Sequence, residues 1–183
     1  MPESWSPKGE RFLFGVTKGS SVSLWTFSLQ DKKATQVADV QSVNPTNAAF
    51  SPDGRWVAYT EGVTGIYVQP FPATGAKYQV SNFIHPVWSR DGRELFSQPA
   101  GQWAVQTITT QPSFAFSAPV PVPRGGAISP GPTGQRNYDV TPDGRTLGVV
   151  AAGQTQSAGS TTPQIQVVLN WFEELRARVP PTN

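Results

Sequence analysis

Five polar side chains lie three or four residues before the Ser or Thr of a short turn motif that occurs four times in the chain. His85, the only histidine of the chain, lies four residues before Ser89 of its turn. Asn47 and Asn137 hold the equivalent position before Ser51 and Thr141. Glu3 and Tyr138 occupy the position that follows. If the turns meet at one end of the fold, these side chains form a polar rim suited to a polar ligand or a divalent metal ion. His85 and Glu3 are then the candidate metal ligands, whereas the sequence assigns no catalytic residue.

The sequence contains no recognised catalytic motif beside this rim. A Gly-x-Ser-x-Gly elbow, a His-Glu-x-x-His pair and a phosphate-binding glycine loop are all missing. Because there is one histidine and no cysteine, chemistry that needs two imidazoles or a thiolate within one chain is excluded. His85 also precedes Pro86, so the competing interpretation is an ordinary loop histidine.

The four turn motifs share the pattern Ser/Thr-Pro-Asp-Gly, preceded by an apolar residue and followed by an apolar run. They span residues 4–12, 49–57, 87–95 and 139–147. This order of residue types is typical of a type I turn, in which Pro sets φ and Gly accepts a positive φ. Each motif predicts a β-hairpin, with positive φ at Gly54, Gly92 and Gly144. The aspartates are expected to form the turns rather than to act as acids or metal ligands: Asp53, Asp91 and Asp143.

The spacing of the turns predicts the fold. The turn glycines at positions 9, 54, 92 and 144 are 45, 38 and 52 residues apart. A period near 45 is typical of four-stranded propeller blades rather than of helical solenoids. We therefore predict an all-β protein, a β-propeller segment of four blades in a single domain, 1–183, with blades at about 4–40, 47–82, 85–122 and 137–175. About fifteen short strands are expected, with one short helix over Trp171–Arg178. Inner strands line the channel of a propeller, which would gather the rim.

Composition supports this class and excludes others. The 183 residues include 17 Gly and 18 Pro, which leaves little room for a coiled coil or a helical bundle. Aromatic residues reach 11%, too many for a disordered linker. The formal net charge is +2, without a basic stripe, so no nucleic-acid partner is expected.

Membrane insertion is not expected either, since no apolar run approaches the ~20 residues of a span. The first residues have neither the basic region nor the apolar core of a signal peptide. The chain as written is therefore expected to be cytoplasmic, with a periplasmic or extracytoplasmic location left open for a parent propeller.

The repeat resembles the TolB-like propeller repeat, a relative of WD-type blades. The last repeat and its tail, residues 138–145 and 167–175, resemble the end of the C-terminal propeller of bacterial eukaryotic-like serine/threonine kinases. Lys8 and Arg90 depart from the pattern, standing where Asp and Pro are usual, and no kinase motif is present. Since propellers of this family generally have more than four blades, the resemblance implies that the chain is part of a larger propeller.

Two functions from different classes remain open. The first is a binding or scaffold module without an autonomous catalytic motif, which takes a protein or a small polar ligand at the channel. The second is a metal- or water-dependent hydrolase of phosphoesters or esters at the channel rim, with a divalent metal ion as the possible cofactor. Metal dependence of an activity would separate the two.

We also predict a homodimer. Four blades leave two open faces rich in Phe, Trp and Val, and a soluble monomer rarely exposes more than a few hundred Å² of such surface. A twofold dimer that completes an eight-bladed ring would bury both faces at once. It would also bring two copies of His85 and Glu3 around one channel.

Overall fold

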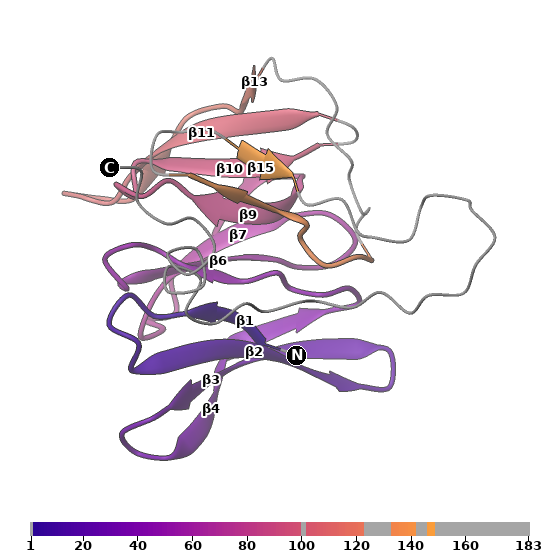
Figure 1. Cartoon of the computed structure of the whole chain (residues 1–183), viewed down its shortest axis with the longest axis vertical. Coiled ribbons are helices and arrows are strands. Elements are labelled where there is room, and N and C mark those ends of the chain that lie inside the picture. The colour runs from indigo at the N-terminus through magenta and orange to yellow at the C-terminus, as the bar shows by residue number, and fades with distance from the viewer. Residues whose placement is uncertain (1, 100–101, 123–132, 142–145, 149–183) are drawn as a thin grey trace, which may run out of the picture. The chain divides into compact units, whose positions relative to one another are not determined.

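The computed structural model describes residues 2–99, 102–122, 133–141 and 146–148 (Figure 1). These residues form fifteen strands in four antiparallel sheets, and they include no helix. The prediction of an all-β fold with about fifteen strands is therefore confirmed. The predicted helix over Trp171–Arg178 and the rest of the fourth blade lie outside these ranges. Within them, no helix is long and apolar enough to cross a membrane.

Each of the first two sheets is a blade whose four strands pair in chain order. The first blade consists of β1 (Pro2–Trp5), β2 (Arg11–Lys18), β3 (Ser21–Ser28) and β4 (Lys33–Ser42). The second consists of β5 (Ala49–Phe50), β6 (Trp56–Thr60), β7 (Ile66–Pro70) and β8 (Tyr78–Ser81). All of these strands belong to one compact unit, Met1–Val150.

The third blade has an interrupted outer strand. Its first three strands are β9 (Ile84–Trp88), β10 (Glu94–Gln98) and β11 (Trp103–Thr109). Two short pieces, β12 (Ala115–Phe116) and β13 (Val120–Val122), then pair with opposite ends of β11. Prolines at 119 and 121 lack the N–H that a continuous ladder needs, so the break follows from the sequence. Of the fourth blade, β14 (Tyr138–Val140) pairs with β15 (Thr146–Gly148).

The hairpin turns follow the chemistry of their sequence. Gly54 and Gly92 have φ of 70° and 71°, as the turn pattern predicts, and Gly144 lies outside the described ranges. Asp53 Oδ1 accepts hydrogen bonds from Ser51 Oγ at 2.6 Å and from the Arg55 N–H at 3.0 Å. Asp91 repeats both bonds in the third blade. These carboxylates therefore stabilise their own turns.

Replacing Gly54 by valine is expected to lower the free energy of unfolding by about 1–3 kcal/mol, because a β-branched residue is strained at positive φ. A Cβ at this position would also lie 3.3 Å from Pro7 Cδ of the first hairpin. The matched control is Gly54→Asn, since asparagine tolerates this conformation and should cost clearly less. Thermal unfolding measures both variants. Equal melting temperatures for Gly54→Val and for the unsubstituted chain, called the parent chain below, would contradict the turn assignment.

Three apolar clusters hold successive blades together. Leu13 and Leu24 of the first blade pack with Phe50 and Tyr59 of the second. The second and third blades share a cluster that includes Trp88. A third cluster joins the third and fourth blades, and it includes Val87, Phe96, Trp103 and Tyr138. Each inter-blade face is thus a layer of aromatic and aliphatic side chains, which brings the starts of the inner strands close together.

Candidate functional site

The predicted rim begins with an unusual backbone at two equivalent positions. Asn47 and His85 both have positive φ, 47° and 59°. Few residues other than glycine adopt this conformation, and Asn and His are among the more tolerant. Pro2 holds the same repeat position in the first blade, where its ring fixes a negative φ. The repeat therefore builds its rim differently in the first blade than in the second and third.

His85 is fully buried, with 0% of its surface exposed, and it contacts three separate parts of the chain. Its backbone N–H donates to Thr60 Oγ1 of the second blade at 3.2 Å. Its ring Nδ1 lies 3.1 Å from Gln98 Oε1, and Nε2 lies 3.3 Å from the Gly134 carbonyl oxygen. The Tyr138 hydroxyl donates to the His85 carbonyl. His85 thus joins the second, third and fourth blades.

The hydrogen-bond partners of the His85 ring determine which of its nitrogens carries the proton. A carbonyl oxygen only accepts, so Nε2 carries the proton of a neutral ring and Nδ1 is then an acceptor. Gln98 Nε2 has no partner in the described contacts, and a half-turn of the Gln98 amide would supply it as the donor to Nδ1. Burial lowers the pKa of His85 below its ordinary value of 6.5, and the charge of Arg136 adds to that effect. At neutral pH the ring is therefore neutral.

Asn47 meets the same segment of chain as His85. Its Nδ2 donates to the Gly134 carbonyl at 3.3 Å, and its Oδ1 accepts from the Arg136 N–H at 2.8 Å. Arg136 Nη1 donates in turn to the Pro86 carbonyl at 2.9 Å. The segment that leads into β14 is therefore held by rim residues of both preceding blades.

Glu3 lies in a different set of contacts. Thr46 Oγ1 donates to both carboxylate oxygens, at 2.6 and 2.7 Å, and the Ala48 N–H donates to Glu3 Oε2 at 2.6 Å. Burial raises the pKa of Glu3 above its ordinary value of 4.5, and the bonds from Thr46 and Ala48 oppose part of that rise. Gly15 leaves the room that this carboxylate needs, since a Cβ there would lie 3.0 Å from Glu3 Oε1.

The five predicted rim residues are thus only partly brought together. The side chains of His85 and Asn47 and the hydroxyl of Tyr138 meet around the segment that leads into β14. The hydrogen bonds of Glu3, in contrast, join the first blade to the second. Asn137 directly precedes β14. In the described parts of the chain no three His, Asp or Glu side chains are grouped so as to hold a metal ion. A metal role for His85 and Glu3 therefore stays a prediction.

A second repeat position also faces the rim, and the sequence reasoning missed it. Gly15, Thr60 and Gln98 each lie nine residues after the serine of their hairpin. Gly15 makes room for Glu3, Thr60 accepts from His85, and Gln98 faces the His85 ring. Aligning this position as well as the start of the inner strand would have found them. Gly134 and Arg136, by contrast, belong to no repeat.

No protein-family model and no curated protein matches the chain. Among solved structures it is similar to TolB from Acinetobacter baumannii, with 22% identity and a TM-score of 0.52 over 79% of this chain and 41% of that chain. It is also similar to the β-propeller domain of the Trilobed protease from Pyrococcus furiosus, with 14% identity and a TM-score of 0.46 over 64% of this chain and 42% of that chain. The chain has the fold of a partial β-propeller.

The similarity to TolB concerns the fold, and the chain spans less than half of that TolB chain's length, 41%. The predicted partial TolB-like propeller is thus confirmed at the level of fold. Kinase attachment, the ligand and the oligomeric state are matters for proposal.

Proposed function

We propose that the chain is a binding and scaffold module, a segment of a larger TolB-like propeller whose first blade docks against a further blade. The resemblance of its last repeat and tail supports the narrower proposal that this propeller is of the kind attached to bacterial eukaryotic-like serine/threonine kinases. The observation that carries the proposal is the exposure of Trp5, at a repeat position that is buried in the next two blades.

Trp5 directly precedes the serine of its hairpin, as Phe50 and Trp88 do in the second and third blades. Phe50 and Trp88 are each 7% exposed, because each packs against the preceding blade. Trp88 Nε1 even donates to the Ala49 carbonyl of the second blade at 3.2 Å. Trp5 is 60% exposed. The first blade therefore presents a face of the kind that a neighbouring blade covers.

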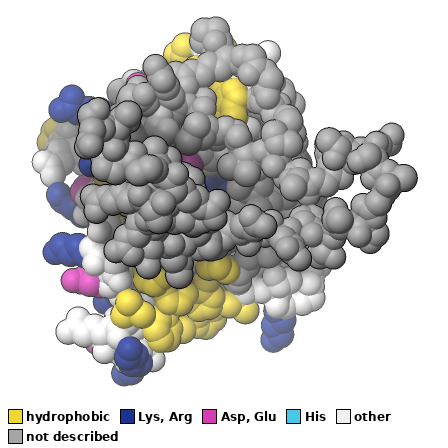
Figure 2. Space-filling view, in the orientation of Figure 1, with side chains coloured by type: hydrophobic (Ala, Val, Ile, Leu, Met, Phe, Trp, Pro, Cys, Tyr) yellow, Lys and Arg dark blue, Asp and Glu magenta, His cyan; other side chains and the backbone are white. Residues whose placement is uncertain are grey.

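The surroundings of Trp5 fit that role. Its ring lies 5.2 Å from that of Phe12, which in turn contacts Phe14 and Phe27 at 5.6 and 5.4 Å. Beside them is a cleft of about 290 Å³ lined by Trp5, Phe12 and Leu13 among others. Hydrophobic side chains also gather at the foot of Figure 2, where the first blade lies in Figure 1. An aromatic layer of this kind is typical of a protein-binding surface.

We further propose that the covering blade belongs to a second copy of this chain. The face continues the series of inter-blade layers, so a blade with the same repeat is the most complementary occupant. Two copies of four blades would close an eight-bladed ring without a free edge. Such a ring would also provide the channel at which a protein or a small polar ligand binds.

Sedimentation at micromolar concentration tests the proposal. We expect the parent chain at twice its 19.7 kDa mass, and we expect Trp5→Glu to weaken association at least tenfold, as loss of a buried aromatic anchor does. Val63→Glu is the matched control, because Val63 is 62% exposed but lies in the loop between β6 and β7. Its mass should equal that of the parent chain.

A parent chain that sediments at 19.7 kDa would overturn the second copy as occupant. If both glutamate variants dissociated equally, association would not depend on the first-blade face. Far-ultraviolet circular dichroism of all three proteins confirms that any change in mass is not caused by unfolding.

The contacts of the rim do not favour the hydrolase alternative. Both ring nitrogens of His85 and both oxygens of Glu3 already have partners within the chain. They act here as links between blades. A divalent-metal-dependent esterase activity that a chelator removes would restore the hydrolase as the better assignment.

A further inference from the structure

The hairpin turns of successive blades meet through a proline and a glycine. A Cβ at Gly54 of the second hairpin would lie 3.3 Å from Pro7 Cδ of the first hairpin. A Cβ at Gly92 of the third hairpin would lie 3.5 Å from Pro52 Cδ of the second. Both prolines hold the second position of the turn pattern, and both glycines hold the fourth. The proline of one hairpin therefore rests on the glycine of the next.

Gly9 of the first hairpin has the same conformation and no such neighbour. Its φ is 70°, against 70° and 71° at Gly54 and Gly92. Among the described residues, none beyond the two chain neighbours of Gly9 has an atom within 4 Å of a Cβ placed there. The repeat thus prepares at Gly9 the surface on which a hairpin proline rests in the next two blades.

A backbone carbonyl is the second group that the face of the first blade would contact. Trp88 Nε1 donates to the Ala49 carbonyl, which lies three residues before Pro52 of the preceding hairpin. Trp5 holds the position of Trp88 in the first blade, is 60% exposed and carries the same indole donor. A segment that covers the first blade as the second blade covers the third therefore presents a carbonyl and, three residues later, a proline.

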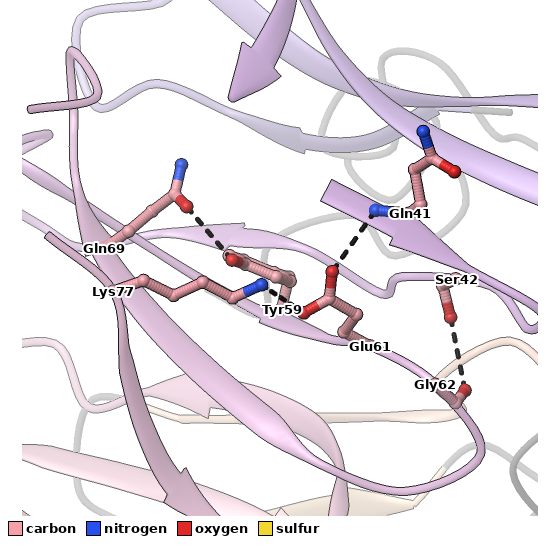
Figure 3. Close-up of polar contacts among 7 residues, drawn as sticks. All are labelled: Gln41, Ser42, Tyr59, Glu61, Gly62, Gln69 and Lys77. Carbon is pink, nitrogen blue, oxygen red and sulfur yellow. Dashed lines mark hydrogen bonds and ion pairs between the residues drawn. The ribbon is translucent and has the colours of Figure 1, made fainter. Parts of the chain in front are cut away.

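Other polar contacts between the first two blades do not recur in the repeat. Glu61 Oε1 accepts from the Gln41 N–H of β4 at 3.3 Å, and Glu61 Oε2 is bound to Lys77 Nζ (Figure 3). Glu61 lies ten residues after the serine of its hairpin, where the first blade has Val16 and the third has Pro99. Side chains of valine and proline have no hydrogen-bonding group. The contacts at the hairpins, which do recur, therefore predict what covers the first blade.

The sequence identifies the hairpin that supplies both groups. Pro7 and Pro52 already rest on glycines of the same chain, and the third hairpin has Arg90 where the others have proline. The fourth repeat has a proline at that position, Pro142, three residues after Asp139. Pro142 lies outside the described ranges, so its part in this argument rests on the sequence alone.

We propose that the first blade binds the fourth-repeat hairpin of a second copy, with Pro142 of that copy on Gly9 and its Asp139 carbonyl at the Trp5 indole. This inference rests on the proposed function and names the residues that recognise each other. Each copy gives its fourth hairpin to the other, so the twofold axis makes the two contacts equivalent. A proline loses no side-chain entropy when it is buried, which favours it as the contact residue.

Gly9→Asn tests the position that receives the proline. Asparagine tolerates a positive φ, so the chain should fold as the parent does, whereas the added side chain occupies the space that the ring needs. We expect association, measured by sedimentation, to weaken about tenfold or more. Gly19→Asn is the matched control: Gly19 has a φ of 60° and equally open surroundings, but it lies at the opposite end of β2. Its association should equal that of the parent chain.

Mixing two variants tests whether Gly9 and Pro142 meet across one interface. Pro142→Arg gives the fourth hairpin the residue of the third, which forms its turn with Arg90, and it should weaken association as Gly9→Asn does. In a dimer of one variant with the other, both changes fall in one interface and the second interface has neither. At a concentration at which each variant alone sediments at 19.7 kDa, the equimolar mixture should therefore contain particles of twice that mass.

The outcomes separate this contact from the dimer itself. A parent chain that sediments at 19.7 kDa would overturn the second copy as occupant, and this contact with it. A dimeric parent whose association Gly9→Asn or Pro142→Arg leaves unchanged would overturn the contact and keep the dimer. A mixture of two impaired variants that stays at 19.7 kDa would do the same, because the two residues would then lie in different interfaces.

Discussion

Replacing His85 by alanine is expected to lower the free energy of unfolding by about 3–5 kcal/mol. The side chain is fully buried, so its removal leaves a cavity, and cavities of this size cost about 2–5 kcal/mol. The change also removes the ring partner of the Gln98 amide, and an unpaired buried polar group costs about 1–3 kcal/mol when water does not replace the partner. The Gly134 carbonyl keeps its hydrogen bond from Asn47 Nδ2. Chemical denaturation measures the loss.

Lys32→Ala is the matched control for the backbone. Lys32 has a positive φ of 54° like His85, but its side chain is exposed in the turn between β3 and β4. Alanine should change the free energy of unfolding by about 1 kcal/mol or less there, because lysine and alanine are strained alike in the left-handed conformation. If His85→Ala cost no more than Lys32→Ala, the ring contacts with Gln98 and Gly134 would not contribute to stability.

The repeat made much of this fold predictable. The Ser-Pro-Asp-Gly pattern specifies local turn geometry, and Asp53 and Asp91 make the same two bonds in different blades. Because each turn fixes the register of its hairpin, alignment on the serine also placed Asn47 and His85 at equivalent points. Their shared positive φ shows that the alignment was right at the level of the backbone.

The partners of the rim were not predictable in the same way. Arg136 and Asn47 are 89 residues apart, and their bond depends on the path of a segment that belongs to no repeat. Glu3 was grouped with His85 because both lie near the start of an inner strand. In the first blade, however, the proline at position 2 excludes the left-handed backbone found at Asn47 and His85. The Glu3 carboxylate instead joins Thr46 and Ala48, and this arrangement could not be read from spacing.

The exposed face of the first blade was predictable only in part from the sequence. The sequence predicts that Trp5, Phe50 and Trp88 are equivalent, which the hairpins bear out. Whether the position is buried depends on what precedes the blade, and only the structure gives the contrast between 60% and 7% exposure. Equivalent residues in a repeat thus share their conformation more reliably than their environment.

Substitution of Glu3 is the second change with a large expected effect. Glu3→Ala and Glu3→Gln should change the free energy of unfolding in different directions. Glu3→Ala should lower the free energy of unfolding at pH 8 by about 2–3 kcal/mol, because the buried Ala48 N–H loses a charged acceptor. Glu3→Gln keeps an oxygen for Ala48 and can donate its NH₂ group to Thr46 Oγ1. It also removes a partly buried charge, so its stability at pH 8 should equal or exceed that of the parent chain.

The pH dependence of unfolding then identifies the carboxylate as the cause. Since burial raises the pKa of Glu3 above 4.5, the folded chain binds more protons than the unfolded chain just above that pH. The contribution of Glu3 is therefore fully present below pH 4.5, and it is lost as the pH rises through the raised pKa. We expect the parent chain to lose stability relative to Glu3→Gln over this interval, measured as the difference between their denaturation midpoints at each pH. A difference that stays constant from pH 4 to pH 8 would mean that the Glu3 carboxylate titrates alike in the folded and unfolded chains.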